Sequence, residues 1–567
     1  MTRLPPALAP LRHTAYRRLW MANVVTSLGL WLQNTGAGWL MTSLAPVPII
    51  VAMVQVATIL PTFLLALPGG ALADIVDRRR FLIGTQLWTM LAAATLAALT
   101  LLHQTTAASL LLFTFAIGIG GALTAPAWSA IVPDLVPRGD LVQAISLGGI
   151  GFNLARAVGP ALAGALVLLG GAGLAFAIYA VSFVAVIWAL WVWRGRRRDQ
   201  ATALPREHLL SAMRAGARFV HSTPAIRAAM IRCFAYAFPA SAPWALLPLV
   251  VRAQLHLGPG MFGLILGVMG AGGVSAGLAL PLISARLSRS EIVFLATLSS
   301  CAGIALVGLA RHWSVAAAGM LLFGTGWVTA FSMTQAAAQL ACPPWVRARA
   351  LAIYQLSFNG ALASGSLAWG WLGNRVGLSH ALVAAAALGV AMALPVRIFG
   401  LDRQAVRPRA EEPLSALEPE APAGELAPVL ARARQRVMEL VRYEVPPGER
   451  SRFLRIMCEV RMVRRRSGAL SWQLYEDVAH PDRFLESWLL ADWTDHMREH
   501  ARLSAEDQAT LASAASFCVR SRDGASRHIA IDPAHDPVAA AQQRVIGWPP
   551  PKAAPYRGRT EEGMPSS

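Results

Sequence analysis

The chain has 567 residues, of which 55% are hydrophobic and 14% charged, and its mean hydropathy is +0.48. Soluble domains carry about 25% charged residues, so this composition excludes a purely soluble protein. The formal net charge of +19 comes from residues 1–400, because residues 401–567 contain equal numbers of basic and acidic residues. The excess positive charge therefore belongs to the hydrophobic part, which favours a membrane protein over a nucleic-acid-binding one.

Twelve stretches before residue 400 are apolar over the roughly 20 residues that a membrane-spanning helix needs. Their expected limits are 19–43, 49–73, 81–102, 108–130, 141–168, 173–193, 226–251, 259–284, 292–310, 314–338, 347–373 and 379–399. The first is too long and polar for a cleaved signal peptide, so we expect a retained helix. Arginines gather in alternate loops, which predicts that both termini are cytoplasmic.

The spans form two nearly equal halves, 1–193 and 226–400, joined by a basic linker over 194–225. This arrangement indicates an internally repeated transporter. Part of the linker has apolar residues at helical spacing, at Leu209, Leu210, Met213 and Val220. We expect an interfacial helix on anionic lipid there, and a solvated basic linker is the alternative.

The segment after the second span runs Gly70-Ala-Leu-Ala-Asp74-Ile-Val-Asp77-Arg78-Arg79-Arg80. Acids beside arginines can form charge-assisted bonds that break and re-form when two halves rock. The segment resembles the signature between spans 2 and 3 of the major facilitator superfamily, although Ile75 and Asp77 depart from it. The resemblance implies a gate in which Gly70, Asp74 and Arg78 take part, with Asp74 facing the start of span 11. The alternative is that the arginines only fix the topology.

Span 5 contains Asn153-Leu-Ala-Arg156-Ala-Val-Gly159-Pro160. Pro160 removes a backbone hydrogen bond and predicts a kink at Gly159 and Pro160. The pair is similar to the Gly-Pro signature of superfamily antiporters and exporters, although a simple packing kink is the alternative. We identify Arg156 as the only charge deep within a predicted span, which makes it a candidate for binding an anionic substrate group. The alternative is that its side chain snorkels to the interface.

Proton-coupled carriers commonly use a membrane-embedded carboxylate, yet residues 141–198, 208–290 and 292–400 contain no Asp or Glu. Asp134, beside Arg138, is the first candidate for coupling, and His103, His256 and His312 near the span ends are the alternatives. The cavity is therefore expected to be lined by uncharged polar and aromatic groups, which suit a bulky amphipathic molecule. The candidates are Asn23, Trp31, Gln33, Asn34, Gln55, Asn153, Trp244, Gln335, Tyr354, Gln355 and Asn359. Helix packing is the alternative role for each of them.

Three further segments, starting at Pro126, Ala242 and Pro344, resemble the transmembrane secretion effector branch of the superfamily, which is related to enterobactin-type exporters. The resemblance covers about residues 10–525. It implies residence in the cytoplasmic membrane and outward movement of small molecules.

Residues 401–427 are rich in Pro, Glu and Ala and indicate a linker. Strand and helix patterns then alternate as β-α-β-β-α over 428–525, which predicts a small ferredoxin-like α+β domain. The stretch from Arg464 to His500 resembles the tail domain of the same family, itself similar to antibiotic-biosynthesis monooxygenases that form dimeric barrels. Residues 526–567 are expected to be disordered.

The prediction is an all-α membrane protein of twelve transmembrane helices in two six-helix halves, with the α+β domain at the C-terminus. We expect this protein to work as a secondary active exporter of amphipathic drug- or siderophore-like molecules, with transport coupled to protons. We expect no enzyme activity, cofactor, metal or nucleic-acid partner. No P-loop occurs, which argues against ATP-driven export, and the five cysteines form no clustered motif, which argues against a metal site. A homodimer could form through the tail domain. The alternative function is a membrane-anchored sensor or redox protein, in which Trp472, Trp488, Trp493 and His496 surround an apolar pocket.

Overall fold

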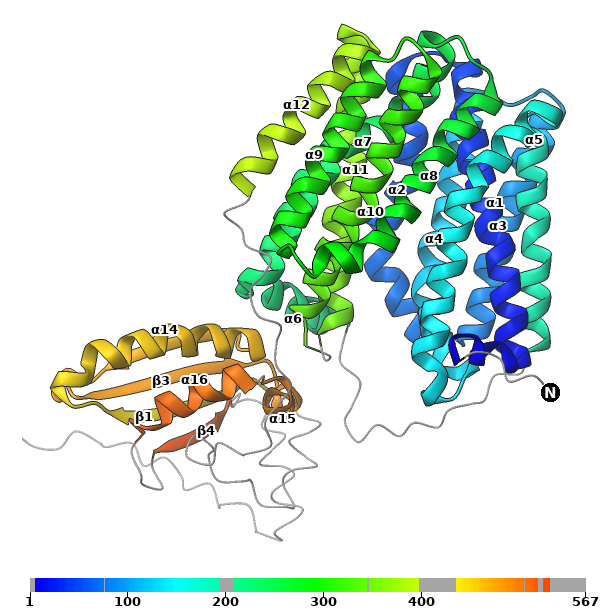
Figure 1. The fold of residues 1–567 in the computed structure, drawn as a ribbon. Coiled ribbons are helices and arrows are strands. Elements are labelled where there is room, and N and C mark those ends of the chain that lie inside the picture. Colours follow the sequence, from blue (N-terminus) through cyan, green and yellow to red (C-terminus); the bar gives the residue numbers. More distant parts are fainter. Residues whose placement is uncertain are drawn as a thin grey trace, which may run out of the picture. The chain divides into compact units, whose positions relative to one another are not determined.

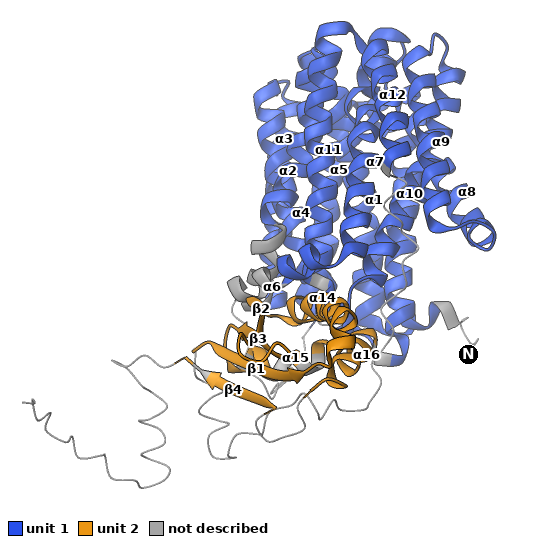
Figure 2. Cartoon of the chain, turned by 90° about the vertical axis from the view of Figure 1, so that its left-hand side faces the viewer, with its two compact units in different colours: residues 1–201, 208–406 blue, residues 202–207, 407–567 orange. Residues whose placement is uncertain are grey.

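The structure is a computed structural model that describes residues 6–75, 77–193, 209–343, 346–396, 435–503, 505–518 and 524–530. The chain divides into a helical unit and a smaller unit near the C-terminus (Figures 1 and 2). The predicted linkers at 194–208 and 401–427 and the predicted tail from 531 onwards lie outside the described residues.

Five helices form the first half of the helical unit. They are α1 (Thr14–Leu44), α2 (Pro48–Ile75), α3 (Arg78–Leu101), α4 (Ala107–Leu135) and α5 (Leu141–Val192). Local chemistry sets their ends, since Asp77 caps α3 by accepting a hydrogen bond from the Arg80 backbone N–H. The 52-residue α5 is interrupted at Gly170 and Gly171, where Gly171 has φ of +74°. Glycine adopts this conformation without steric cost, so the break separates spans 5 and 6 as predicted.

Six long helices form the second half. They are α7 (Pro224–Leu249), α8 (Pro259–Ser284), α9 (Arg289–Leu309), α10 (Trp313–Leu340), α11 (Arg347–Val376) and α12 (Leu378–Val396). Ser288 and Glu291 cap α9 reciprocally, which fixes where this span begins. Among the described residues, nine helices have the length and hydropathy to cross a membrane, one of them the two-span α5. With α1 and α11, at 31 and 30 residues, the predicted twelve-helix fold is confirmed.

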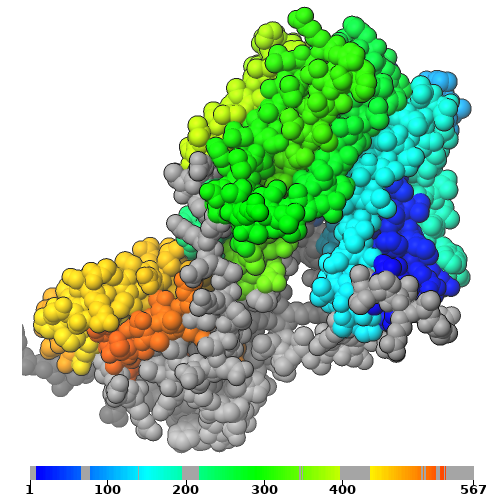
Figure 3. Space-filling view, in the orientation of Figure 1, coloured from blue at the N-terminus to red at the C-terminus, as the bar shows by residue number. Residues whose placement is uncertain are grey.

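The halves meet most closely where α5 crosses α8. A Cβ atom on Gly263 would lie 2.5 Å from the Pro160 carbonyl oxygen and 2.7 Å from the Gly164 Cα. Only glycine allows the two backbones to approach so closely. These residues lie toward the end of the bundle that is remote from Arg78–Arg80, which we call the opposite end. Figure 3 shows the two halves separated by a hollow toward the other end, the arginine-rich end.

The basic linker ends in a helix, α6 (Leu209–Ser222), that packs against α11. Its described residues Phe219 and Val220 are 3% and 7% exposed in the core of the second half. The prediction that Val220 faces lipid is therefore wrong. An amphipathic pattern identifies an apolar face but does not say whether lipid or protein covers it.

The C-terminal unit is a four-stranded antiparallel sheet with helices on one face. Its elements are β1 (Val437–Glu444), α14 (Arg450–Ser467), β2 (Ser471–Glu476), β3 (Arg483–Leu490), α15 (Trp493–Arg502), α16 (Ala505–Ala515) and β4 (Ala525–Ile529). The strand order β2-β3-β1-β4 is that of a ferredoxin-like fold, which confirms the predicted class. Helix α16 and strand β4 were not predicted. Because β4 pairs with β1, the sheet extends to Ile529, beyond the predicted domain end at residue 525.

Candidate functional site

A cavity of about 200 Å³ lies between the two halves of the helical unit. Helices α1 and α2 line it from the first half, and α7, α8, α10 and α11 line it from the second. The predicted residues on its wall are Trp31, Asn34, Gln55 and Trp244. Residues on its wall that the sequence did not single out include Thr58, Phe262, Leu266 and Trp327.

Aromatic rings form one side of this cavity. The ring centroids of Trp31 and Trp244 are 6.2 Å apart, and those of Trp244 and Trp327 are 5.4 Å apart with the planes at 62°. The side chain of Trp31 fits because Gly159 of α5 has none: a Cβ there would lie 2.5 Å from the Trp31 Cβ. Among the described residues, the buried indole nitrogens of Trp31 and Trp244 have no hydrogen-bond partner. Both N–H groups can therefore donate to a ligand.

Several predicted cavity residues lie elsewhere. Tyr354 is fully buried and donates a 3.0 Å hydrogen bond to the Thr334 hydroxyl, so it joins α11 to α10. Gln33 is 1% exposed, on the face of α1 whose neighbours Gly29 and Gly36 contact α5.

Five other candidates are also absent from the described lining of the cavity, namely Asn23, Asn153, Gln335, Gln355 and Asn359. The Asn153 amide donates to the Gly149 carbonyl of its own helix. Gln335 and Asn359 are half-buried.

Arg156 borders a smaller cavity beside the central one. This side cavity shares Trp31, Trp244 and Leu266 with the central cavity and is closed by Gly270 and Gly273 of α8. Arg156 lies about four helical turns from the start of α5 at Leu141, too deep for the predicted snorkelling to the interface.

A second arginine is also buried in a span, contrary to the prediction that Arg156 is the only one. Arg232 of α7 is 3% exposed and donates to the Ser290 carbonyl.

The arginine-rich end of the first half holds a charged network. Arg78 lies 3.4 Å from the Asp134 carboxylate, whereas the side chain of the predicted neighbour Arg138 lies outside the described residues. Arg79 donates to the Leu190 and Trp191 carbonyls at the end of α5, where a cation is favourable. The predicted gate residues Gly70 and Asp74 lie in α2, but their side chains are outside the described set.

The C-terminal unit has a second cluster of buried charge. Arg464 lies 3.3 Å from Glu486 and 3.2 Å from Glu499, and its guanidinium stacks over Trp488. Trp472 and Tyr443 both donate to Glu486. Burial and the negative charge of Glu486 raise the pKa of Tyr443 well above its ordinary value. The alternative function predicted an apolar pocket at this place, but these side chains bind one another.

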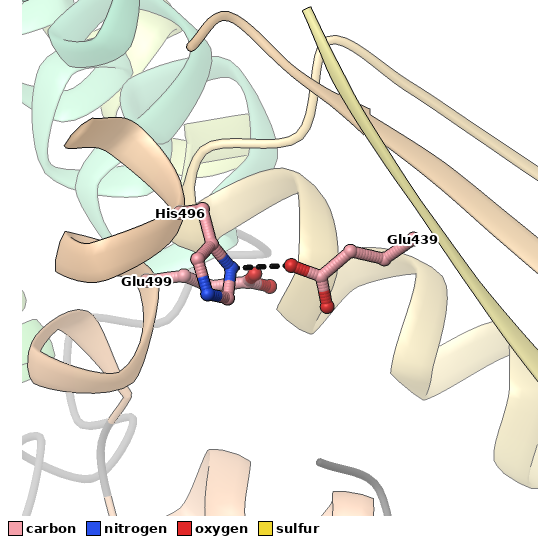
Figure 4. Close-up of side chains that lie close together, drawn as sticks. All are labelled: Glu439, His496 and Glu499. Carbon is pink, nitrogen blue, oxygen red and sulfur yellow. Dashed lines mark ion pairs between the residues drawn. The ribbon is translucent and has the colours of Figure 1, made fainter. Parts of the chain in front are cut away.

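Glu439, His496 and Glu499 offer one possible metal ligand atom each, all within 4.8 Å of one another (Figure 4). Glu439 pairs with His496 and, at 3.5 Å, with Arg527. Burial alone would raise the pKa of Glu439, but the hydrogen bond and charge of His496 lower it below the ordinary value. Because Arg464 also binds Glu499, two guanidiniums would repel a cation here. The donor set does not fit a metal and is better described as an ion-pair network.

Comparisons with known proteins agree with this architecture. The chain is 26% identical to the staphyloferrin A transporter of Staphylococcus aureus over 292 residues, which cover 50% of this chain and 71% of the relative. It is 23% identical to the enterobactin exporter EntS of Citrobacter koseri over 321 residues, 56% of this chain and 75% of the relative.

Solved structures share the fold of the helical unit. A bacterial homologue of the human lysosomal transporter Spinster, in an inward-facing unoccupied conformation, matches with a TM-score of 0.54 at 13% identity, covering 70% of this chain and 98% of that one. A bacterial homologue of the iron transporter ferroportin, in an inward-facing state, matches with a TM-score of 0.53 at 17% identity, covering 68% and 98%. The nucleoside transporter NupG matches with a TM-score of 0.53 at 13% identity, covering 68% of this chain and 98% of that one.

The sequence profile of one family extends over residues 6–531 and so includes the C-terminal unit. Two helical halves around a cavity, without a nucleotide-binding motif, are the architecture of a secondary transporter. The chain is a multi-pass membrane transporter for small molecules, and it belongs to the transmembrane secretion effector family of the major facilitator superfamily.

Proposed function

We propose that this chain exports an amphipathic, siderophore- or drug-like molecule across the cytoplasmic membrane by alternating access, with both termini in the cytoplasm. The relatives named for staphyloferrin A and enterobactin support a substrate of this class. The cavity between the halves is the observation that carries the proposal. Its wall comes from both halves, so rocking one half against the other would expose the same site to either side in turn.

The structure supports this cycle at one end of the bundle. The glycine contact between α5 and α8 holds the halves together at the opposite end, while the hollow between them lies toward the arginine-rich end. With the termini in the cytoplasm, the arginine-rich end is the inner one, and this conformation would load substrate from inside.

Coupling to protons is assigned to the pair between Arg78 and Asp134. The Asp134 side chain is 18% exposed, so water reaches it, whereas most of the spans contain no acid. Protonation would remove the charge that holds Arg78 and so loosen the network beside the proposed gate at Asp74.

The test is energised efflux from cells that lack their major pumps and are loaded with a panel of lipophilic drugs and catechol-type chelators. We expect efflux by the full chain, loss of efflux in Asp74→Asn, and efflux by a chain ending at Leu401. If Asp74→Asn transports normally at normal protein levels, the gate is wrong. If no compound is exported, the transport proposal fails for this substrate class.

A matched pair of variants tests the coupling. Asp134→Asn should abolish the dependence of efflux on the pH gradient. Asp140→Asn is the control, since it removes a carboxylate at the same end that pairs with His13 at 2.9 Å instead of with Arg78. Equal pH-driven flux in wild type and Asp134→Asn would rule out Asp134 as the coupling group.

The C-terminal unit is proposed to join two copies of the chain. Helices cover one face of its sheet, while Met438 and Tyr475 on the other face are 39% and 50% exposed. A second sheet could cover this surface. Native mass spectrometry of the full chain should give a dimer that Met438→Glu weakens, and a monomeric wild type would contradict the proposal.

A further inference from the structure

Arg156 is a cation in the wall of a cavity at mid-bundle depth. Its side chain borders the side cavity together with Trp31, Trp244 and Gly273. Gly273 lies directly beside this group, since a Cβ atom on it would be 3.7 Å from a terminal nitrogen of the guanidinium. A cation this deep is costly to hold unless something neutralises it.

The chain offers little that could neutralise this charge. Within the described residues, no hydrogen bond or ion pair joins the Arg156 side chain to another group. The sequence also lacks acidic residues that could pair with Arg156, because residues 141–198, 208–290 and 292–400 contain no Asp or Glu. The helices α5, α7, α8 and α10, which line the side cavity, therefore cannot provide a carboxylate.

The neighbouring polar groups are also hydrogen-bond donors. The buried indole N–H groups of Trp31 and Trp244 have no partner among the described residues, and both rings line the same side cavity as Arg156. A buried donor without a partner costs about 1–3 kcal/mol. Three unpartnered donors around one space require acceptor atoms, and a negative charge, from a molecule that enters it.

We propose that the boundary between this side cavity, of about 10 Å³, and the central cavity is an anion subsite, in which Arg156 binds a carboxylate of the exported molecule. The rings of Trp31 and Trp244 line the same space, and their unpartnered N–H groups are the further donors that we assign to its oxygen atoms. The apolar or aromatic body of the substrate lies in the adjoining cavity against Trp31, Trp244 and Trp327. The inference rests on the proposed transport function and adds a substrate class, amphipathic carboxylates, to it.

The test uses two probes of the same shape, 2-naphthoate and its uncharged amide, 2-naphthamide. The purified full-length protein is heated with each probe, since a ligand that binds the folded state raises the unfolding temperature. We expect 2-naphthoate to stabilise the wild type more than 2-naphthamide does. In Arg156→Gln the affinity for 2-naphthoate should fall by about tenfold or more, while that for 2-naphthamide stays unchanged. Arg156→Lys keeps the charge and should retain part of the preference.

Flux of the same probes into proteoliposomes separates this inference from the proposed function. Carboxylate-specific binding that depends on Arg156, without flux, would refute transport of these compounds and leave the subsite standing. An equal loss for both probes in Arg156→Gln would show a merely structural role and overturn the subsite. The subsite is equally overturned if the wild type binds 2-naphthamide as well as 2-naphthoate, or binds neither.

Discussion

Two arginines inside this chain have opposite surroundings, Arg464 being fully buried and Arg156 half-buried. Arg464 in the C-terminal unit contacts two carboxylates and stacks on Trp488, with its guanidinium 3.6 Å from the ring centroid. Burial alone would lower the pKa of Arg464, but attraction to Glu486 and Glu499 raises it above the ordinary value. Arg156 in the helical unit borders a cavity among aromatic and apolar side chains. The same type of side chain is thus paired within the fold in one region and borders a cavity, where it can bind a ligand, in the other.

The difference is informative because burial by itself does not identify a functional charge. A buried ion whose partners are all present within the fold holds those partners in place. A buried ion without a partner has to obtain one from outside. The number of oppositely charged groups around the arginine therefore distinguishes the two regions. The C-terminal cluster contains a His and three Glu side chains, and the cavity in the helical unit is lined by aromatic and apolar side chains.

Removing Arg464 should have the largest effect. Arg464→Met leaves Glu486 and Glu499 buried without their cation, which costs about 3–5 kcal/mol of the free energy of unfolding of this domain. Hydrogen exchange of the full-length protein should show lost protection in α14 and β3, while α7 and α8 are unchanged. Preserved protection in β3 would mean that the cluster contributes little to stability.

Acid pH should weaken the same cluster. The folded pKa of Glu439 is below its ordinary value, so its contribution to stability is complete above that value and is lost as the pH falls through the folded one. Protection of β1 amides should thus be steady between about pH 7 and 5 and decline below about 4.5. Glu439→Gln is the control, because its difference from the wild type should shrink as the pH falls. A constant difference over this range would contradict the assignment.

A smaller effect is expected for Arg252, which joins the two halves at the opposite end. It donates a 3.1 Å hydrogen bond to the Thr42 hydroxyl and a second to Ser43, and it lies over the ring of Trp39. Arg252→Gln should weaken this closure by about 1 kcal/mol, or about fivefold in population.

The measurement is labelling of Thr58→Cys in the cavity by a membrane-impermeant maleimide, in a background without native cysteines. Faster labelling is expected in Arg252→Gln. Arg311→Gln is the matched control, because it removes another arginine from the same end. An unchanged rate would show that the glycine contacts alone keep this end closed.

Hydropathy and loop charge are properties of short segments, and for this reason the sequence predicted the twelve spans and the β-α-β-β-α order well. Which face of a span meets the cavity depends on how neighbouring helices rotate and pack. Trp244 and Tyr354 both looked suitable, but only Trp244 lines the cavity, since Tyr354 binds Thr334. Trp327 was missed because a cavity tryptophan has the same sequence surroundings as a lipid-facing one such as Trp371, which is 52% exposed.

The C-terminal unit shows the same limit in a different form. Glu439 stands in phase with Val437 and Val441 on β1, so its inward direction could have been read from the alternation. Strand β4 could not be predicted from the sequence, because it is short and polar and is defined by its pairing with β1. The ion pairs of Arg464 could not be predicted from the sequence either, since its partners Glu486 and Glu499 come from elements that only the fold brings together.

The smallest expected effect on stability, that of Arg156→Met, is the most direct test of the contrast between Arg156 and Arg464. Arg156→Met replaces a cation that has no partner among the described residues with an apolar side chain of similar length. It should therefore not lower the unfolding temperature of the purified protein, and removing the desolvation cost should raise that temperature slightly. Arg232→Met is the comparison variant in the same bundle, because Arg232 is 3% exposed and donates to the Ser290 carbonyl, so its loss should destabilise by about 1–3 kcal/mol. A large destabilisation by Arg156→Met would mean that the fold itself uses this charge. A stable protein that no longer distinguishes a carboxylate from its amide would mean that the charge is kept for the ligand.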